Sequence, residues 1–220
     1  MASGTAKLIV QQVKRALDAG TLLIDLRPHA EFATGYIPGS INVMFSRKSL
    51  PERVATAIPP GPPIVLLSRE ETVAEAAAEA LQGVDRNPLQ GILAGGIEAW
   101  SRVGLPLVSL QQLTIAELWQ RLNAPHDDLV LIDVRETFEW DLGYIEGSLL
   151  IPLGEIWRRA EGLDRGKELI LICEEGIRSS TAASILLHRG FTRAANVPGG
   201  FGDWFRANYP SVRPPKPPKR

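Results

Sequence analysis

Short apolar runs alternate with stretches of helical periodicity along the chain. In the second half the apolar runs lie near residues 129–134, 149–151, 168–172 and 193–197, and the helical stretches lie near 115–123, 137–142, 154–160, 178–189 and 200–207. Continuous apolar strands that alternate with helices are typical of a parallel sheet covered on both faces. The pattern therefore predicts an α/β fold in which a mainly parallel sheet is flanked by helices.

The sequence also repeats itself. Residues 22–43 align with 130–151 at a constant offset of 108, and 93–100 match 197–204 at an offset of 104. The paired positions are Asp25 with Asp133, Arg27 with Arg135, Glu31 with Glu139, Gly35-Tyr36-Ile37 with Gly143-Tyr144-Ile145, and Gly39-Ser40 with Gly147-Ser148. Two copies of one domain of about a hundred residues explain this repeat.

We therefore expect three regions in the chain. The first domain covers 1–105 and the second covers 111–210. A proline-rich basic segment, 211–220, follows them and is expected to be disordered. Within the second domain, Thr114 and Glu117 have the spacing of a capping box at the start of a helix.

Composition narrows the classes of function. The 24 lysines and arginines nearly balance the 25 aspartates and glutamates, so no overall field attracts nucleic acid or an anionic membrane. The apolar runs are too short for a membrane span, and the N-terminus lacks the apolar core of a secretory signal. A single cysteine favours the reducing cytoplasm. His29, His126 and His188 have no clustered partners, so we expect neither a metal nor another cofactor.

The one cysteine, Cys173, lies where an anion is stabilised. It follows the apolar run 169–172 and precedes a helical stretch, so its sulfur faces the start of a helix. The partial positive charge and unpaired N–H groups there favour a thiolate. Gly176 lets the loop turn with its amides inward, and Arg178 adds a fixed cation that either faces an anion or braces the loop. These features predict a nucleophile.

The first half has lost this arrangement. The alignment places Ser68 at the position of Cys173 and Val73 at that of Arg178, and no glycine matches Gly176. A serine without a base is not a nucleophile. Ser68 and Glu71 instead have the spacing of a helix capping box. We expect this half to be inactive.

Two repeated features have a structural interpretation. Because Asp133 and Arg135 recur in the half that lacks the reactive loop, we expect the strand-end carboxylate to hold backbone N–H groups rather than to act as an acid or base. The pair Gly199-Gly200 is expected to allow a close approach of strand and helix.

Four features taken together resemble the rhodanese (sulfurtransferase) superfamily in its tandem form. They are the strand ending in Asp133-Val134-Arg135, the stretch from Gly143 to Ser148, the loop CEEGIRS and the Gly199-Gly200…Trp204 helix. The resemblance implies two rhodanese-like domains and a loop whose amides surround the cysteine sulfur. It also implies that the thiolate takes a sulfane sulfur from a donor, becomes a persulfide, and passes the outer sulfur to an acceptor.

On this interpretation Cys173 is catalytic, and the substrate is bound by the loop residues Glu174, Glu175, Gly176, Ile177 and Arg178. The donor is thiosulfate or a persulfide, and the acceptor is cyanide or a thiol; a protein partner is also open. If Glu174 or Glu175 faces the site, it repels the thiosulfate dianion. In so tight a loop the side chains are expected to point outward.

Two alternatives stay open. The chain could be a non-catalytic docking module of the rhodanese type. It could also be a cysteine-based phosphatase or arsenate reductase, although relatives with that chemistry have one more residue between cysteine and arginine. The shorter loop of this chain encloses a single sulfur atom better than a tetrahedral oxyanion.

Overall fold

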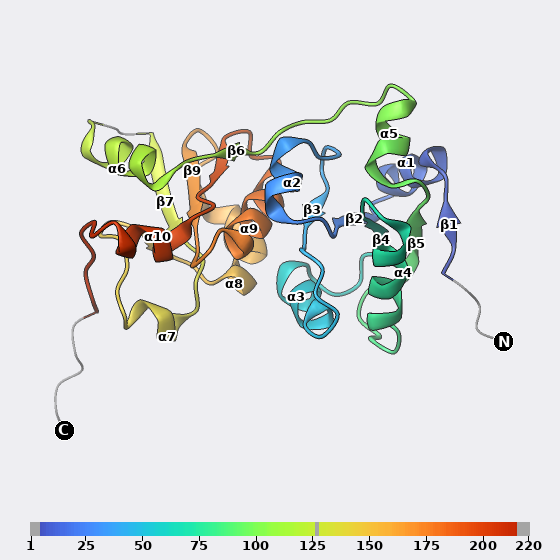
Figure 1. The fold of residues 1–220 in the computed structure, drawn as a ribbon, viewed down its shortest axis with the longest axis horizontal. Coiled ribbons are helices and arrows are strands. Elements are labelled where there is room, and N and C mark those ends of the chain that lie inside the picture. Colours follow the sequence, from blue (N-terminus) through green and yellow to red (C-terminus); the bar gives the residue numbers. More distant parts are fainter. Residues whose placement is uncertain (1–4, 126–127, 215–220) are drawn as a thin grey trace. The chain divides into compact units, whose positions relative to one another are not determined.

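The computed structural model describes residues 5–125 and 128–214. The chain divides between Leu110 and Gln111 into two compact units, which are the two halves of the sequence repeat. In Figure 1 the first half is coloured blue to green and the second yellow-green to red.

The first half contains a five-stranded parallel sheet in the order β1-β5-β4-β2-β3. Its elements are β1 (Lys7–Leu8), α1 (Val10–Asp18), β2 (Leu22–Asp25), α2 (His29–Thr34), β3 (Ile41–Asn42), α3 (Leu50–Ala57), β4 (Ile64–Leu67), α4 (Glu71–Ala80), β5 (Leu89–Leu93) and α5 (Gly96–Arg102).

The second half repeats this sheet in the equivalent order β6-β10-β9-β7-β8, again with every pair parallel. Its elements are β6 (Gln111–Gln112), α6 (Ile115–Asn123), β7 (Leu129–Asp133), α7 (Thr137–Trp140), β8 (Leu149–Leu150), α8 (Leu153–Arg159), the 3-10 turn η1 (Ala160–Gly162), β9 (Glu168–Ile172), α9 (Ile177–His188), β10 (Ala194–Asn196) and α10 (Gly200–Arg206). The predicted fold of two flanked parallel sheets is confirmed.

Helices cover both faces of the second sheet. On one face, Leu118 of α6 and Trp204 of α10 pack with the strand residues Leu131, Ile170 and Ala195 in one buried cluster. Helix α9 packs on β9 and β10 and against α8. Because both faces are covered, the central strand β9 is apolar and buried from Leu169 to Ile172, while Glu168 at its amino end pairs with Arg121.

One expected helix cap forms and the other does not. The Thr114 hydroxyl accepts a hydrogen bond from the Glu117 N–H while the Glu117 carboxylate accepts one from the Thr114 N–H, so this capping box is confirmed. The capping box expected for Ser68 and Glu71 is wrong. Helix α4 begins at Glu71 itself, whose carboxylate accepts hydrogen bonds from the Gly95 N–H and from Lys7 instead.

The repeated aspartate and arginine have a structural role in both halves. Asp133 accepts hydrogen bonds from the backbone N–H and the guanidinium of Arg135, which also donates to the Gly143 carbonyl at 2.7 Å. Asp25 and Arg27 make the same contacts in the first half. The pair is buried and fixes the loop after each strand, as expected from its presence in both copies.

The segment after the last helix of each half returns to the domain. In the second half, Trp204 Nε1 donates to the Pro210 carbonyl, and Val212 exchanges two backbone hydrogen bonds with Tyr144. Val212 falls in the segment that the sequence assigns to a tail, so the folded part extends at least to this residue. Residues 215–220 of that segment lie outside the described residues.

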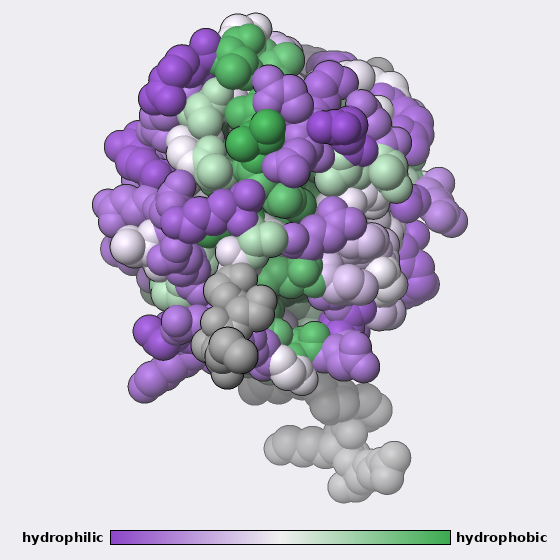
Figure 2. Space-filling view, turned by 90° about the vertical axis from the view of Figure 1, so that its right-hand side faces the viewer, coloured by the Kyte–Doolittle hydropathy of each residue, from purple (hydrophilic) through white to green (hydrophobic). Residues whose placement is uncertain are grey.

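The side of the first half that bears β1 faces the viewer in Figure 2, where hydrophobic residues form a band between hydrophilic areas. Ile9, which directly follows β1, is 56% exposed.

No helix in the described ranges is long and apolar enough to cross a membrane.

Candidate functional site

Cys173 is the first residue after the central strand β9. Parallel strands of an open α/β sheet place their ligand sites at the carboxyl ends, and this residue occupies such an end. The side chain is almost completely buried, with 1% of its surface exposed. The predicted nucleophile is therefore held inside the loop that connects β9 to α9.

Two donors point at its sulfur. The Gly176 N–H and the Ser179 hydroxyl each donate a hydrogen bond to Cys173 Sγ at 3.2 Å. Helix α9 begins at Ile177, so its partial positive end lies beside the same atom. Hydrogen bonds to an anionic form favour that form, and these groups are placed to stabilise negative charge on the sulfur.

Two carbonyls of the loop are held by helix α10, away from the sulfur that the Gly176 N–H contacts. The N–H groups of Phe201 and Gly202, in the first turn of α10, donate to the carbonyls of Cys173 at 2.7 Å and of Glu174 at 3.1 Å. A Cβ on Gly200 would overlap those two carbonyls. Gly200 therefore permits a close approach of helix α10 to the loop, rather than the strand-to-helix contact that the sequence suggested for Gly199-Gly200.

Gly176 has a second structural requirement. Its φ is +83°, in the left-handed region where a side chain is strained, and an added Cβ would lie 2.5 Å from Pro198 Cα. Only glycine satisfies both conditions. The loop can therefore close over the sulfur only with this residue at its last position before α9.

Arg178 braces the loop. Its guanidinium donates to both carboxylate oxygens of Glu139 on α7, at 2.5 and 2.7 Å. This pairing raises the pKa of Arg178. Burial alone raises the pKa of Glu139, but hydrogen bonds from Arg178 and from the Glu136 N–H outweigh it and leave that pKa below its ordinary value. Of the two roles considered from sequence, the contacts fit the bracing one.

The other predicted binding residues lie in the loop itself or directly after it. The Glu174 carboxylate lies 3.6 Å from Arg135 Nη1, and Glu175 is exposed. Ile177 is half-buried at the start of α9. The structure thus brings Cys173, Gly176 and the first turn of α9 together, while the Glu174 side chain is directed toward Arg135.

Sequence reasoning missed two residues. Ser179 donates to the sulfur, and Glu139 holds Arg178. Glu139 carried a signal, because Glu31 repeats it in the first half. The sequence signal for Ser179 was only weak. Whether this residue faces the sulfur depends on where helix α9 begins.

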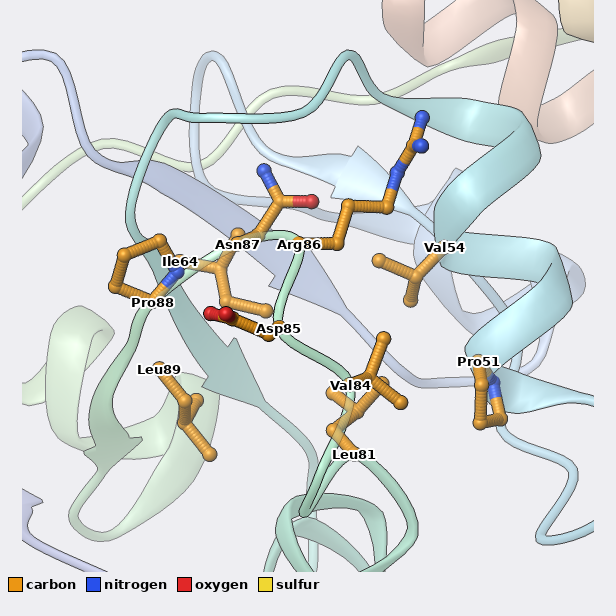
Figure 3. A pocket seen from close by; sticks show the side chains of 10 residues that line it. All are labelled: Pro51, Val54, Ile64, Leu81, Val84, Asp85, Arg86, Asn87, Pro88 and Leu89. Carbon is orange, nitrogen blue, oxygen red and sulfur yellow. The ribbon is translucent and has the colours of Figure 1, made fainter.

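A hollow in the first half differs from this site. Figure 3 shows it lined by Pro51, Val54, Ile64, Leu81, Val84, Asp85, Arg86, Asn87, Pro88 and Leu89. It lies at the first residues of β4 and β5, whereas Ser68 follows the other end of β4. The Asn87 amide donates to backbone carbonyls of the neighbouring loop. This hollow is therefore not the counterpart of the cysteine loop.

No group of three or more His, Cys, Asp or Glu side chains in the described ranges could hold a metal ion. His126, which the sequence reasoning considered, lies outside those ranges.

Comparison with known protein families also finds two copies of one domain. The model of the rhodanese-like domain matches twice, at residues 10–103 and 114–207. A protein of Bacillus subtilis named "Putative sulfur carrier protein YrkF" is 34% identical over 96 residues, which cover 44% of this chain and 51% of that protein. The chain thus spans about half the length of this relative.

Two further relatives match close to their full length. A sulfurtransferase of Allochromatium vinosum is 30% identical over 48% of this chain and 97% of its own. A rhodanese-related protein from Thermoplasma volcanium has 31% identity, covers 46% of this chain and 97% of its own, and superposes with a TM-score of 0.42. Because the domain model accounts for most of both halves, the chain belongs to the rhodanese family and carries its domain twice.

Proposed function

We propose that the second half is a sulfurtransferase in which Cys173 is the nucleophile. The observation that carries this proposal is the pair of donors on a buried sulfur, the Gly176 N–H and the Ser179 hydroxyl. A thiolate held by such groups needs no adjacent base. The first half, with Ser68 at the same position, is the inactive copy and serves as a scaffold.

The reaction transfers one sulfur in two steps. The Cys173 thiolate attacks the outer, sulfane sulfur of thiosulfate or of a persulfide and forms an S–S bond. The donor's own bond to that sulfur breaks, and its electron pair leaves with sulfite or with the donor thiolate. Cyanide or a thiolate then attacks the outer sulfur of the Cys173 persulfide, and the cysteine leaves as a thiolate. No electrons are gained or lost overall.

The loop residues support both steps. Gly176 and Ser179 donate to the anionic sulfur in each resting state, and Arg178 keeps the loop in place through Glu139. Glu174, Glu175 and Ile177 border the position that the substrate takes. A nucleophile that acts alone requires its thiol to stay reduced, which fits a reducing compartment such as the cytoplasm.

The alternative phosphatase chemistry has less support. An arginine that binds a phosphate oxyanion must present its N–H groups to that anion. Both terminal nitrogens of Arg178 donate to Glu139 instead. The sulfur transfer proposal requires no free guanidinium and is therefore favoured.

One experiment separates the candidate functions. The full chain is incubated with thiosulfate or with glutathione persulfide, and its intact mass is taken before and after cyanide is added. A gain of one sulfur that cyanide removes is expected for the parent and for Ser68→Ala, and no gain is expected for Cys173→Ala. Hydrolysis of an aryl phosphate without sulfur loading would establish the phosphatase instead. If neither reaction occurs, the non-catalytic docking module replaces the proposal.

A further inference from the structure

Three large apolar side chains are highly exposed in the second half. Phe138 is 68% exposed, Leu142 70% and Phe205 63%. Phe138 lies on α7, Leu142 follows it by one helical turn, and Phe205 lies on α10. Isolated exposed apolar residues are common, so their significance depends on where they lie and on what occupies the same positions in the other half.

Both elements border the cysteine loop. Helix α7 is joined to it through Glu139 and Arg178, and α10 through the hydrogen bonds from Phe201 and Gly202 to the loop carbonyls. The two elements also meet each other, since a Cβ on Gly143 would lie 3.5 Å from Phe201 Cζ. Leu142 precedes this contact by one residue and Phe205 follows it by one turn. The three exposed apolar residues thus lie on two segments that adjoin the loop, and these segments are called its rim below.

The first half provides an internal control. At the repeat offsets of 108 and 104, the residues that correspond to Phe138, Leu142 and Phe205 are Ala30, Thr34 and Ser101. The scaffold therefore does not require large apolar side chains at these positions. They occur only in the copy that contains the thiol.

The charge of this rim also differs between the halves. Residues 136–146 contain four carboxylates and no lysine or arginine, whereas the corresponding residues 28–38 contain one carboxylate, Glu31. Of the four, Glu139 is paired with Arg178, and the other three, Glu136, Asp141 and Glu146, have no ion-pair partner in the described part of the chain. Arg206, next to Phe205, is itself paired with Asp203. The exposed Glu175 adds to this acidic character.

We propose that Phe138, Leu142 and Phe205, with the surrounding carboxylates, form a docking surface for a protein partner that carries basic and apolar side chains around a reactive cysteine. This inference rests on the proposed function and names the acceptor or donor as a protein. An apolar centre with an acidic rim is complementary to such a partner. The same negative charge repels nucleic acid and anionic lipid.

Sulfur then passes directly between two proteins. The partner thiolate attacks the outer sulfur of the Cys173 persulfide, a new S–S bond forms on the partner, and the old bond breaks with its electron pair left on Cys173. The reverse reaction loads Cys173 from a partner persulfide. The docking surface contributes by holding the partner cysteine at the loop.

Binding of a defined probe tests the surface. The probe is the labelled peptide Lys-Phe-Lys-Leu-Lys-Gly-Cys with its thiol alkylated, and the control peptide has glutamate in place of each lysine. The variant takes the residues of the first half: Phe138→Ala, Leu142→Thr and Phe205→Ser. By fluorescence anisotropy with the full chain, we expect the variant to bind the basic peptide roughly tenfold more weakly. The control peptide should not bind, and added salt should weaken binding.

A kinetic measurement separates docking from chemistry. Parent and variant are loaded with sulfur, and transfer is followed to the unalkylated basic peptide and to cyanide. We expect the variant to lose roughly tenfold in rate to the peptide and nothing to cyanide. Equal binding of the basic peptide by parent and variant would overturn the docking surface, and so would an equal loss of rate to both acceptors. If no sulfur loads at all, the proposed function fails, while the binding measurement still decides this inference.

Discussion

The two halves of the molecule have the same scaffold but differ in the loop after the central strand. Strand order, the buried aspartate and arginine, and the tryptophan bond to a proline carbonyl are common to both. Three residues, 68–70, connect β4 to α4, but four, 173–176, connect β9 to α9. The added residue allows a left-handed glycine next to the helix. On the proposed function, the chemistry of the second half depends on this local change in the loop, and the scaffold forms without it in the first half.

The equivalent glutamates Glu31 and Glu139 each form an ion pair with an arginine, but the two arginines occupy different positions in the sequence repeat. Glu139 is paired with Arg178 at the start of α9, while Arg69, directly after Ser68, lies 3.4 Å from Glu31. Arg69 corresponds to Glu174, and Val73 corresponds to Arg178, so the arginine that holds the glutamate has a different position in each half. In the second half the residue next to Cys173 is therefore a carboxylate and not a guanidinium.

The largest effect is expected from moving the thiol between the halves. In the double variant Ser68→Cys with Cys173→Ser, the first half has a cysteine but neither the left-handed glycine nor the added loop residue. We expect its rate of sulfur loading to fall below about one-hundredth of the parent rate, because the donors that stabilise the anion are missing. Intact mass after timed exposure to glutathione persulfide measures this rate. Loading at the parent rate would show that the fold, and not the loop, supplies the chemistry.

The next largest effect concerns the glycines that let a helix approach each loop. A Cβ on Gly200 would overlap the Glu174 carbonyl, and a Cβ on Gly96 would overlap that of Ser68. We expect Gly96→Ala and Gly200→Ala each to lower the free energy of unfolding by about 3 kcal/mol. Gly147, with φ +81° and open space around it, is the control, and Gly147→Ala should cost about 1 kcal/mol.

Chemical denaturation of each variant provides these values. Only Gly200→Ala should also lose sulfur loading, because Gly96 supports the half without a thiol. If Gly96→Ala left the free energy of unfolding unchanged, the close approach of helix and loop would not be required by the scaffold that both halves share.

A smaller effect is expected from the two glutamates. Glu139→Gln should lower the free energy of unfolding by about 2 kcal/mol, since its carboxylate accepts two short hydrogen bonds from Arg178 in a largely buried position. The equivalent Glu31→Gln should cost at most about 0.5 kcal/mol, because that pair is exposed and longer.

The pH dependence of this difference has a defined sign. The folded-state pKa of Glu139 is lowered from its ordinary value of 4.5, so its contribution is present above pH 4.5 and is lost as the pH falls through the lower folded-state value. The difference between parent and Glu139→Gln in urea denaturation should therefore shrink as the pH falls below 4.5. A difference that stays constant into acid would contradict the ion pair.

Much of the fold could be predicted because its signals are local. The range predicted for strand β9, 168–172, matches the structure, and so does that of helix α6, 115–123. Strand β6 was not predicted, because it is formed by two glutamines whose pairing with β10 is visible only in three dimensions. The expected cap by Ser68 failed for a related reason. Glu71 is held by Gly95 and Lys7, residues distant in sequence.

The candidate site was only partly accessible from sequence. The pattern around Cys173 identified the loop, because a strand, a glycine and a helix follow one another directly. The partner of Arg178 was not accessible, since Glu139 lies 39 positions away and only the fold brings it close. Likewise, the Glu174 carboxylate turns toward Arg135, which the sequence alone could not show.

The smallest effect should come from the hydroxyl on the sulfur. Ser179→Ala removes one of two donors to Cys173 Sγ and leaves the Gly176 N–H in place. We expect sulfur loading at neutral pH to slow about tenfold, which corresponds to the loss of a single hydrogen bond to an anion. The same alignment places Ala74 of helix α4 at the position of Ser179, so the variant gives the second half the residue of the first.

A pH profile distinguishes this role from a merely structural one. If the hydroxyl stabilises the thiolate, the rate of Ser179→Ala should recover at alkaline pH, where the anion forms without it, and Ser179→Thr should retain most of the parent rate. Ser180→Ala, a matched change at the next buried serine of α9, should leave the profile unchanged. A rate that stays tenfold low at every pH would mean that Ser179 serves packing, and the difference between the halves would then rest on the loop backbone and its glycine.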